Sequence, residues 1–515
     1  MSSPPLRPPP SALRARAARL EREGDLAGAL AAYETALAAA PHDVDLLAAL
    51  AQIAERLGMM GPAEGLWRQA CALAPDNLQA QDGRARTLRE LGRYDEAIAV
   101  LQAAITAHPT EARLWNSVGV TLSQQGQTES ALTFYDEALR LDPRLATAAY
   151  NRAGAQFDLG ALEAAQADFA AAGKLARKPA DAAMITFAAA TLALARGDLA
   201  AGWEGYEARL SPHRPKPVTF EAPGRRWTPN LPLAGKRLLV LAEQGLGDEI
   251  LFASLLPEVI EALGPGGHLT LAVEPRLVTL FARSFPQAEV LPHRTETVGG
   301  RARRSAGDLA EPRSIDLWAP LASLPRRFRR DMADFPNRPG FLVPDPKRVD
   351  HWRRWLGEGP PAVGLTWRSG NLLGDRRRQY PPMASWMPVL AAGATRLVNI
   401  QYDVQAEELE ALAALGGRPL LQPPGLDLKN DIDDLAALCC ALDLVVSVSN
   451  ATGQLAGACG APTVMLCVPA AWPRLGQETY PWHPTIRPVA PRIFGEWEPA
   501  MAQAAAVVED LTRRP

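Results

Sequence analysis

The 515-residue sequence lacks the features of membrane, exported and zinc-binding proteins. It contains no run of about 18 apolar residues, so no transmembrane helix is expected. The first ten residues are rich in proline and lack the apolar core of a signal peptide, so we expect a cytoplasmic protein. The five cysteines form no CxxC pair and the seven histidines form no HxxxH pair, which argues against a structural metal site.

An excess of positive charge is also absent. The 54 lysines and arginines nearly balance the 57 aspartates and glutamates, giving a net charge of −3. Chains that bind nucleic acids usually carry a basic excess, so no nucleic-acid partner is expected. Hydrophobic residues make up 47%, which is normal for a globular protein, and the length predicts about three domains.

Glycines, alanines and prolines recur in the N-terminal part with a period of 34 residues. This period is the length of the tetratricopeptide repeat, so we predict five regular repeats over residues 10–177 and a sixth, degenerate one over 181–209. The positions in register are Gly24, Gly58, Gly92, Gly126 and Gly160; Ala29, Ala63, Ala97, Ala131 and Ala165; Ala36, Ala70, Ala104, Ala138 and Ala172; and Pro41, Pro75, Pro109 and Pro143.

Each repeated residue type has a physical role. A glycine suits the left-handed end of the first helix, and the alanines let helices approach closely. Large residues are expected to fill the gaps between neighbouring helices: Tyr33, Trp67, Leu101, Tyr135 and Phe169. Solenoids commonly bind proteins on a concave face, so we predict a protein client there; the alternative is that the array only supports or dimerises the rest of the chain.

Residues 211–235 form a predicted linker, because six prolines in this stretch exclude a regular helix or a central strand. We expect an ordered strap, since Phe220 and Trp227 need burial. The predicted division of the chain is therefore a tail over 1–10, repeats over 11–210, the linker, and α/β domains over 236–345 and 346–515.

Apolar strands alternate with amphipathic helices after the linker. The first strand, 238–241, precedes a glycine turn and a helix over 249–262, and a second series begins at 362–368. This alternation predicts two parallel sheets with helices on both faces. The fold class is thus α + α/β: an all-α solenoid followed by two Rossmann-like domains. Ligands are expected in a cleft at the carboxyl ends of the strands.

The first candidate site is the turn Gln244–Glu249. Gly245 and Gly247 let the backbone approach a ligand at a helix N-terminus. Asp248, facing a cleft together with Gln244 and Glu249, could take a proton from an acceptor hydroxyl. Alternatively, the two acids only cap the helix and oppose its dipole. The turn does not match GxGxxG, the dinucleotide-binding pattern.

Three further segments follow strand ends. Arg368 and the run Asp375–Arg378 suit a phosphate or diphosphate, although a charge run can simply be solvated. The segment Ser447–Gln454 can form an anion cradle, or Ser449 or Asn450 can act as an ordinary N-cap, and the two roles can coexist. Gln401, in the segment 399–403, could contact a base or a ribose.

Three other features remain open or are discounted. Asp431–Asp434 resembles a metal-binding DxD, but acids in a first helical turn suit the dipole, so no metal is predicted. His483 either lines the cleft or packs in the core. The basic stretch Arg294–Arg330 is either a mobile loop over the cleft or a site for an acidic partner.

Several blocks of the sequence resemble a known family. The chain looks like bacterial tetratricopeptide proteins with a GT-B glycosyltransferase domain, and is distantly similar to heptosyltransferases and, in architecture, to O-GlcNAc transferases. The resemblance covers about residues 195–490 plus the repeats. It is carried by Gly202-Trp203 with Tyr206-Glu207, Leu233–Ala253, Val363–Gly370, Asp434–Asn450, Leu455–Thr463 and Tyr480–Arg487.

The resemblance implies roles for individual residues. Asp248 matches the aspartate proposed as a base, and Arg368 matches a position on the donor-phosphate side. Gln454 stands where relatives often have a histidine, and Ser449-Asn450 stand where many have an aspartate-threonine pair. The full set of donor-binding candidates is Arg368, Ser369, Gln401, Ser449, Asn450, Thr452, Gly453 and Gln454.

The resemblance also implies an activity. It is metal-independent transfer of a hexosyl, nonulosonyl or similar group from a nucleotide-sugar, which is a co-substrate, with no cofactor. Some relatives glycosylate flagellin inside the cell, so a flagellin-like client selected by the repeats is expected. Two alternatives stay open: a non-enzymatic adaptor with a degenerate nucleotide-sugar site, which Gln454 favours, and a transferase acting on lipopolysaccharide or another glycan.

Overall fold

The computed structural model forms two compact units. One unit contains residues 1–156 and 167–176, and the other contains residues 157–166 and 177–515. Among the residues that the structure describes, no helix combines the length and the apolar character needed to span a bilayer. The described residues are 10–215, 217–298, 300–307, 309, 314–370 and 378–513.

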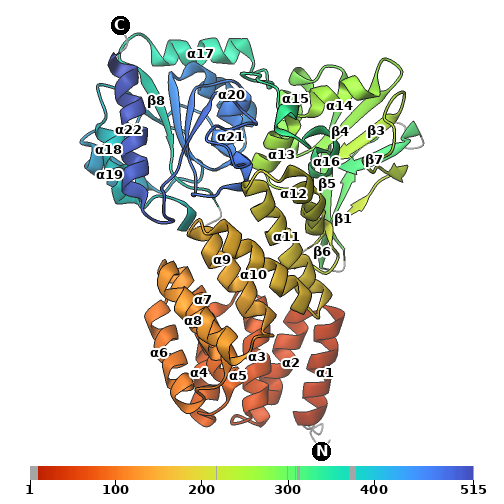
Figure 1. Cartoon of the computed structure of the whole chain (residues 1–515), viewed down its shortest axis with the longest axis vertical. Coiled ribbons are helices and arrows are strands. Elements are labelled where there is room, and N and C mark those ends of the chain that lie inside the picture. The colour runs from red at the N-terminus through yellow and green to blue at the C-terminus, as the bar shows by residue number, and fades with distance from the viewer. Residues whose placement is uncertain are drawn as a thin grey trace, which may run out of the picture. The chain divides into compact units, whose positions relative to one another are not determined.

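The first unit consists of helices, and from α1 to α8 each helix packs against the next along the chain (Figure 1). The unit ends within α9 and α10, so the last residues of α9 and the first residues of α10 are counted with the second unit. The helices are α1 (Pro10–Glu23), α2 (Leu26–Ala39), α3 (Val44–Arg56), α4 (Met60–Leu73), α5 (Leu78–Glu90), α6 (Tyr94–Ala107), α7 (Ala112–Gln125), α8 (Thr128–Leu141), α9 (Ala146–Asp158) and α10 (Leu162–Leu175).

The 34-residue register explains how this unit packs. All ten alanines of the two periodic sets are 0% exposed, and the five periodic glycines have positive φ between 73° and 98°. The large residues predicted to fill the gaps are buried as well. The register therefore predicted the packing of this helical tetratricopeptide solenoid correctly, because each repeat presents the same neighbours to the next.

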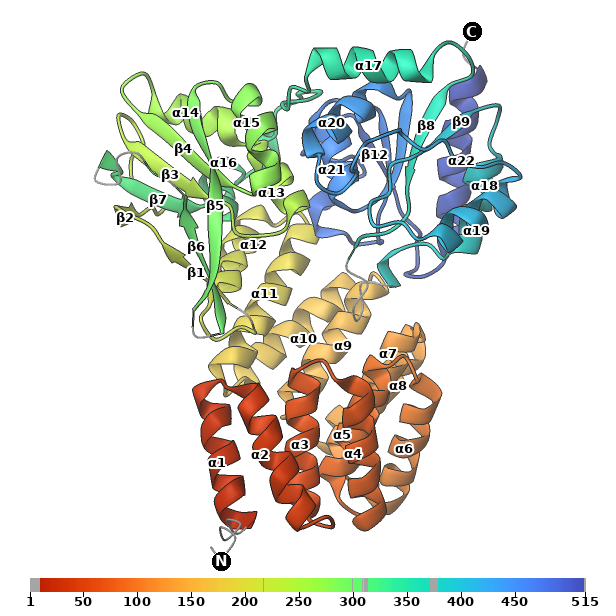
Figure 2. The ribbon, with the colours of Figure 1, turned by 180° about the vertical axis from the view of Figure 1, so that it is seen from behind.

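The second unit includes a helical pair and a seven-stranded sheet. Its strand order is β1-β6-β5-β4-β3-β7-β2, and every pairing is parallel except β5 with β6 (Figure 2). The elements are α11 (Pro179–Ala195), α12 (Leu199–Tyr206), the 3₁₀ turn η1 (Glu207–Leu210), β1 (Val218–Glu221), β2 (Arg225–Arg226), β3 (Arg237–Leu241), α13 (Leu246–Ala253), α14 (Leu256–Leu263), β4 (His268–Val273), α15 (Val278–Ser284), β5 (Ala288–Val298), β6 (Arg301–Ala306), β7 (Leu317–Pro320) and α16 (Pro325–Phe328).

The first sheet departs from the prediction in two ways. Helices pack on one face only: among the described residues, the apolar cluster on the other face, around Leu239 and Leu241, contains no helical residue. The described part of the basic stretch 294–330 includes the antiparallel pair β5–β6 rather than a loop. In agreement with the prediction of an ordered strap without a central strand, the proline-rich segment supplies the two edge strands, β1 and β2. Proline is tolerated at an edge because one side of an edge strand has no hydrogen-bonded neighbour.

The second sheet is fully parallel, with strand order β12-β11-β10-β8-β9. Alternate residues of β10 face opposite cores: Val445 packs with α20 and α21, and Val446 packs with α18 and α22. Helices therefore cover both faces here, as predicted. The elements are α17 (Pro346–Leu356), β8 (Ala362–Thr366), α18 (Met387–Ala391), β9 (Arg396–Asn399), α19 (Ala406–Gly416), α20 (Ile432–Ala441), β10 (Leu444–Val448), α21 (Ala451–Ala458), β11 (Thr463–Leu466), β12 (Ile486–Val489) and α22 (Trp497–Arg513).

Candidate functional site

The loops at the carboxyl ends of the strands surround one cavity of about 930 Å³ within the second unit. Its lining comes from the segments that follow β3, β4, β8, β9, β10 and β11, and from helix α11 and the end of α9. This is the edge at which parallel sheets bind ligands, and the cleft predicted from the sequence lies here.

Two helix N-termini meet at this cavity. Helix α13 follows β3, and helix α21 follows β10 of the other sheet. A Cβ atom on Gly247 would lie 3.2 Å from the Cα of Ala451, so a glycine permits the close approach. Both N-termini carry partial positive charge from unpaired N–H groups, so the cavity favours an anion between the two sheets.

Asp248 lies in the first turn of α13 and lines the cavity with Gly245 and Gly247. The N-cap position of α13 is Gly245, and no side chain caps the helix there. Burial raises the pKa of Tyr206 and of Tyr480, and the charge of Asp248 adds to both shifts. The carboxylate is therefore close to two phenols as well as to the cavity.

Gln244 and Glu249, which were also predicted on the acceptor side, do not line the cavity. The buried Glu249 carboxylate accepts a hydrogen bond from the backbone N–H of Glu274 at 2.9 Å and faces Arg304 at 3.4 Å. The Gln244 Oε1 accepts a hydrogen bond from the hydroxyl of Tyr206 at 3.1 Å. Both side chains hold the protein together instead of facing a ligand, which corrects the expectation for them.

Arg368 has a carboxylate partner within the protein. Its Nε and Nη2 each lie 2.5 Å from one oxygen of Glu408, and Nη2 also donates to the carbonyl of Asp403. Burial alone would raise the pKa of Glu408, but the hydrogen bonds from Arg368, the backbone of Gln405 and the indole of Trp367, together with the charge of Arg368, outweigh burial and lower the pKa. Arg368 is not among the cavity-lining residues, so the phosphate-binding role predicted for it is not supported by this geometry.

Gln401 lies beneath the loop that follows β8 and is fully buried. Its Oε1 accepts hydrogen bonds from the hydroxyl of Thr366 and from the backbone N–H groups of Trp367 and Arg368, at 2.9–3.0 Å. Its Nε2 donates to the carbonyl of Tyr402 at 2.8 Å. These contacts engage the amide within the protein, so Gln401 shapes the loop; a contact with a base or ribose stays a prediction.

The segment after β10 combines the two roles considered for it. Asn450 is the N-cap of α21, because its Oδ1 accepts from the N–H of Gly453 at 3.0 Å. The Asn450 Nδ2 also donates to the hydroxyl of Thr366 and to the carbonyl of Arg368, which joins the loops after β8 and β10. Of the predicted donor-binding set, Ser369, Ser449, Asn450, Thr452 and Gln454 line the cavity.

Gln454 presents an unsatisfied polar atom. Its side chain is 6% exposed and lines the cavity, its Nε2 donates to the hydroxyl of Tyr480 at 2.5 Å, and its Oε1 has no hydrogen-bond partner. Nearby, His483 is buried between the rings of Phe341 and Tyr480. Burial lowers the pKa of His483 to about 3, so this histidine packs in the core and stays neutral.

The acids Asp431–Asp434 serve structural roles. Asp431 caps α20, Asp433 pairs with Arg283, and Asp434 accepts a hydrogen bond from the indole of Trp352 at 2.9 Å. The described residues contain no group of three side chains that could hold a metal. Of the basic run predicted near Arg368, residues 371–377 lie outside the described residues, and Arg378 faces Asp158 at 4.0 Å.

Sequence reasoning missed two basic residues of the cavity. Lys429 Nζ lies 2.8 Å from a carboxylate oxygen of Asp403, and Arg276 Nη1 donates to the carbonyl of Lys429 at 2.9 Å. Arg276 follows the end of β4, and this position at a strand end could have identified it as a cavity residue from the sequence. It also missed Phe187 and Thr191 of α11, because no local pattern indicates that a repeat helix lines the cavity.

Comparison with known proteins agrees with the repeats. Residues 61–112, 83–146 and 119–176 match the tetratricopeptide repeat family model. Among curated proteins, the chain is similar to Protein FlbA of Caulobacter vibrioides, with 46% identity over 380 residues. The match covers 73% of this chain and 64% of FlbA, so the chain spans less than two thirds of that relative's length.

Solved structures also match part of the chain. TTC0263, a tetratricopeptide protein of Thermus thermophilus, is 23% identical, with a TM-score of 0.32, and the match covers 36% of this chain and 99% of TTC0263. PilF of Pseudomonas aeruginosa is 21% identical, with a TM-score of 0.32, and the match covers 39% of this chain and 92% of PilF. These likenesses carry no functional argument.

Proposed function

We propose that the chain is a glycosyltransferase that moves a sugar from a nucleotide-activated donor to a hydroxyl of a protein client. The observation that carries the proposal is the meeting of two helix N-termini, each following a strand of a different sheet, at a cavity lined by Asp248. An anion bound between α13 and α21 would be stabilised by both helix ends. A nucleotide-sugar supplies such an anion in its phosphates.

The reaction that fits this arrangement is a direct displacement. The acceptor hydroxyl oxygen forms a bond to the anomeric carbon, and the bond from that carbon to the donor phosphate oxygen breaks. Asp248 takes the hydroxyl proton, and the nucleoside phosphate leaves with the electron pair. The fixed dipoles of α13 and α21 then stabilise the charge that develops on the leaving phosphate.

The acceptor is proposed to be a protein because the repeats offer a surface for one. Tetratricopeptide arrays commonly bind proteins, and a sugar acceptor does not require such an array. A flagellin-like client follows from the resemblance described above. A lipopolysaccharide or other glycan acceptor would instead leave the repeats without a role in substrate selection.

The proposal is tested first by thermal shift of the full chain with UDP-, GDP-, ADP-, dTDP- and CMP-sugars. We expect one class of donor to raise the melting temperature, because a ligand that binds the folded state stabilises it by mass action. Gln454→Leu, which removes the unpaired cavity oxygen, should reduce that shift, and the exposed Met387→Ala serves as the control.

Transfer itself is tested with Asp248→Asn. This variant should keep the thermal shift but lose transfer of sugar to cellular protein, measured by intact mass of proteins from producing cells. Unchanged transfer would show that Asp248 is not the base.

A non-enzymatic adaptor is the second candidate, and one observation favours it. The guanidinium of Arg368, the conspicuous basic group at this strand end, is already paired with Glu408. No thermal shift with any donor would support the adaptor, in which the repeats bind a client and the α/β part has lost its donor.

A further inference from the structure

The last helical pair is packed into the core of the second unit. Trp203 of α12 is buried, and its Nε1 donates to the carbonyl of Arg329 at 2.7 Å. The rings of Trp203 and of Tyr206 each lie 6.2 Å from the ring of Phe252 in α13. Helix α12 therefore rests directly on the helix that carries Asp248.

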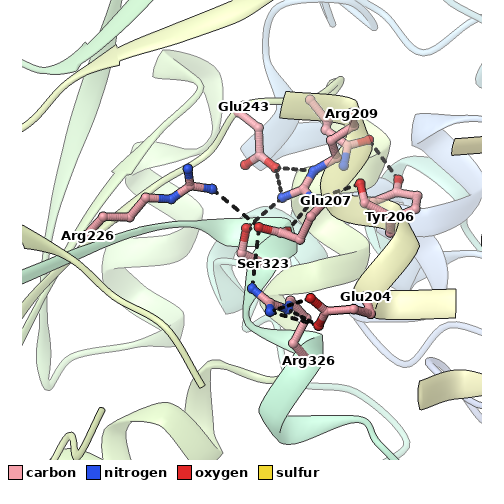
Figure 3. A network of polar contacts seen from close by, with 9 residues as sticks. Glu204, Tyr206, Glu207, Arg209, Arg226, Glu243, Ser323 and Arg326 are labelled. Atoms are coloured by element: carbon pink, nitrogen blue, oxygen red, sulfur yellow. Dashed lines mark hydrogen bonds and ion pairs between the residues drawn. The ribbon is translucent and has the colours of Figure 1, made fainter. Parts of the chain in front are cut away.

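A buried ion pair connects the end of this helical pair to the turn after β3 (Figure 3). Arg209 Nε and Nη2 lie 3.0 Å and 2.9 Å from Glu243 Oε1, and the two side chains are 6% and 3% exposed. The guanidinium is fully engaged, because Nη2 also donates to Ser323 and Nη1 donates to Glu207. Both side chains are therefore held in place by several polar contacts in a buried position.

The residues on either side of Glu243 are held as well. The Tyr206 hydroxyl donates to Gln244 Oε1 at 3.1 Å, and on the opposite side Arg304 Nη1 donates to the carbonyl of Ala242 at 2.6 Å. Only residues 242–245 separate the end of β3 from the start of α13. Fixing three of these four residues fixes where α13 begins, and Asp248 lies in its first turn.

A role in stability alone does not account for the chemistry of this pair. Burial raises the pKa of Glu243, so forming the charged pair here is costly, and apolar residues of similar volume usually stabilise a core as well or better. What a buried ion pair adds is direction, because a guanidinium fork defines the position of its carboxylate.

We propose that Arg209 and Glu243 are positioning residues: through them the helix that ends the repeats sets the position of the turn 242–245 and hence of Asp248. This inference rests on the proposed role of Asp248 as the base. The network has a second, more exposed end, where Nε and Nη2 of Arg326 contact both carboxylate oxygens of Glu204 at 2.8–3.0 Å. Arg326 also lies 3.6 Å from Glu207, which links the two ends, but it does not contact the turn and therefore provides the control.

The test compares Arg209→Lys and Glu243→Gln with Arg326→Lys in the full chain. Lysine keeps the charge but loses the fork. Hydrogen–deuterium exchange without ligand should become faster over residues 242–253 in the first two variants and stay unchanged in the control. The rate of nucleotide release is then measured with the donor found by thermal shift. In Arg209→Lys and Glu243→Gln, kcat should be about tenfold lower than in wild type, and the KM for the donor should stay within about twofold, because misplacing a catalytic group affects the chemical step.

The outcomes separate this inference from the proposed function. If the wild-type chain turns over no donor, the glycosyltransferase proposal fails, but the exchange of residues 242–253 still tests the positioning of the turn. Exchange that stays unchanged in Arg209→Lys, or that rises equally across the whole second unit, overturns the inference. Equal loss of kcat in Arg209→Lys and Arg326→Lys also overturns it, because only the first residue contacts Glu243.

Discussion

Single residues at the cavity show what a position in sequence can and cannot predict. Asp248, Asn450 and Gln454 follow strand ends and line the cavity, as expected. Gln401 and Arg368 also follow strand ends, yet their polar groups bond to other parts of the protein. A strand end brings a residue to the correct edge of the sheet, but its rotamer depends on which partners lie within reach.

His483 yields a prediction about pH at the residue scale. Its pKa is about 3 in the folded protein because of burial, against an ordinary value of about 6.5 when unfolded. As the pH falls from about 6.5 towards about 3, the unfolded chain binds a proton that the folded chain does not, so stability is lost in this window. When the pH is lowered from 7 to 5, this histidine should lower the free energy of unfolding by about 2 kcal/mol.

The measurement is chemical unfolding of wild type and His483→Gln at pH 7 and pH 5. The variant should lose about 2 kcal/mol less than wild type over this interval, whatever its stability at pH 7. The exposed His351→Gln should behave like wild type. Equal pH dependence in wild type and His483→Gln would contradict the neutral, buried histidine.

Helices of the repeats are the elements that the sequence specified best. Their boundaries follow from glycines, alanines and capping residues that lie within or next to each helix. The strands β5 and β6 were harder to predict, because the stretch 294–306 is rich in charged side chains. Its pairing depends on β1 and β4, which are far apart in the sequence, and local periodicity carries no information about them.

Two glycines on equivalent helices provide a matched test of repeat packing. A Cβ on Gly119 of α7 would lie 2.6 Å from the ring of the buried Tyr135, whereas a Cβ on Gly154 of α9 would meet no atom within 4 Å. Gly119→Ala should therefore cost about 1–3 kcal/mol through overpacking. Gly154→Ala should gain up to about 1 kcal/mol from helix propensity.

Thermal unfolding of the full chain followed by helical circular dichroism measures both changes. Opposite signs are expected for the two substitutions. A stabilising Gly119→Ala would show that the ring of Tyr135 moves aside without cost and that the repeats are more loosely packed than described.

At the scale of the whole molecule, the two sheets share one apolar core within the second unit. Leu256 and Val240 of the first sheet region belong to the same cluster as Val445 and Met465 of the second. We therefore expect the two sheets to unfold together, although the β–α alternation predicted two separate domains. Cooperative units follow shared cores rather than sequence segments.

Leu256→Ala tests this shared core. This substitution should lower the free energy of opening, measured by hydrogen exchange in peptides from both β3 and β10, by about 2–4 kcal/mol, because the cavity that it leaves lies in the common cluster. Hydrogen exchange in increasing denaturant measures the two peptides in one experiment. The exposed Met387→Ala should change neither peptide, and loss of protection in β3 alone would contradict cooperative unfolding.

The tetratricopeptide register, the β–α alternation and the edge at which the cavity lies can all be predicted from the amino-acid sequence. These features depend on contacts between residues close in the chain, or on a rule that holds for every parallel sheet. Three other features depend on how distant segments pack: Arg368 pairs with Glu408, helices leave one face of the first sheet uncovered, and Arg209 reaches Glu243. In each case the deciding partner lies on another element, and the burial that makes the contact strong exists only after the chain has folded.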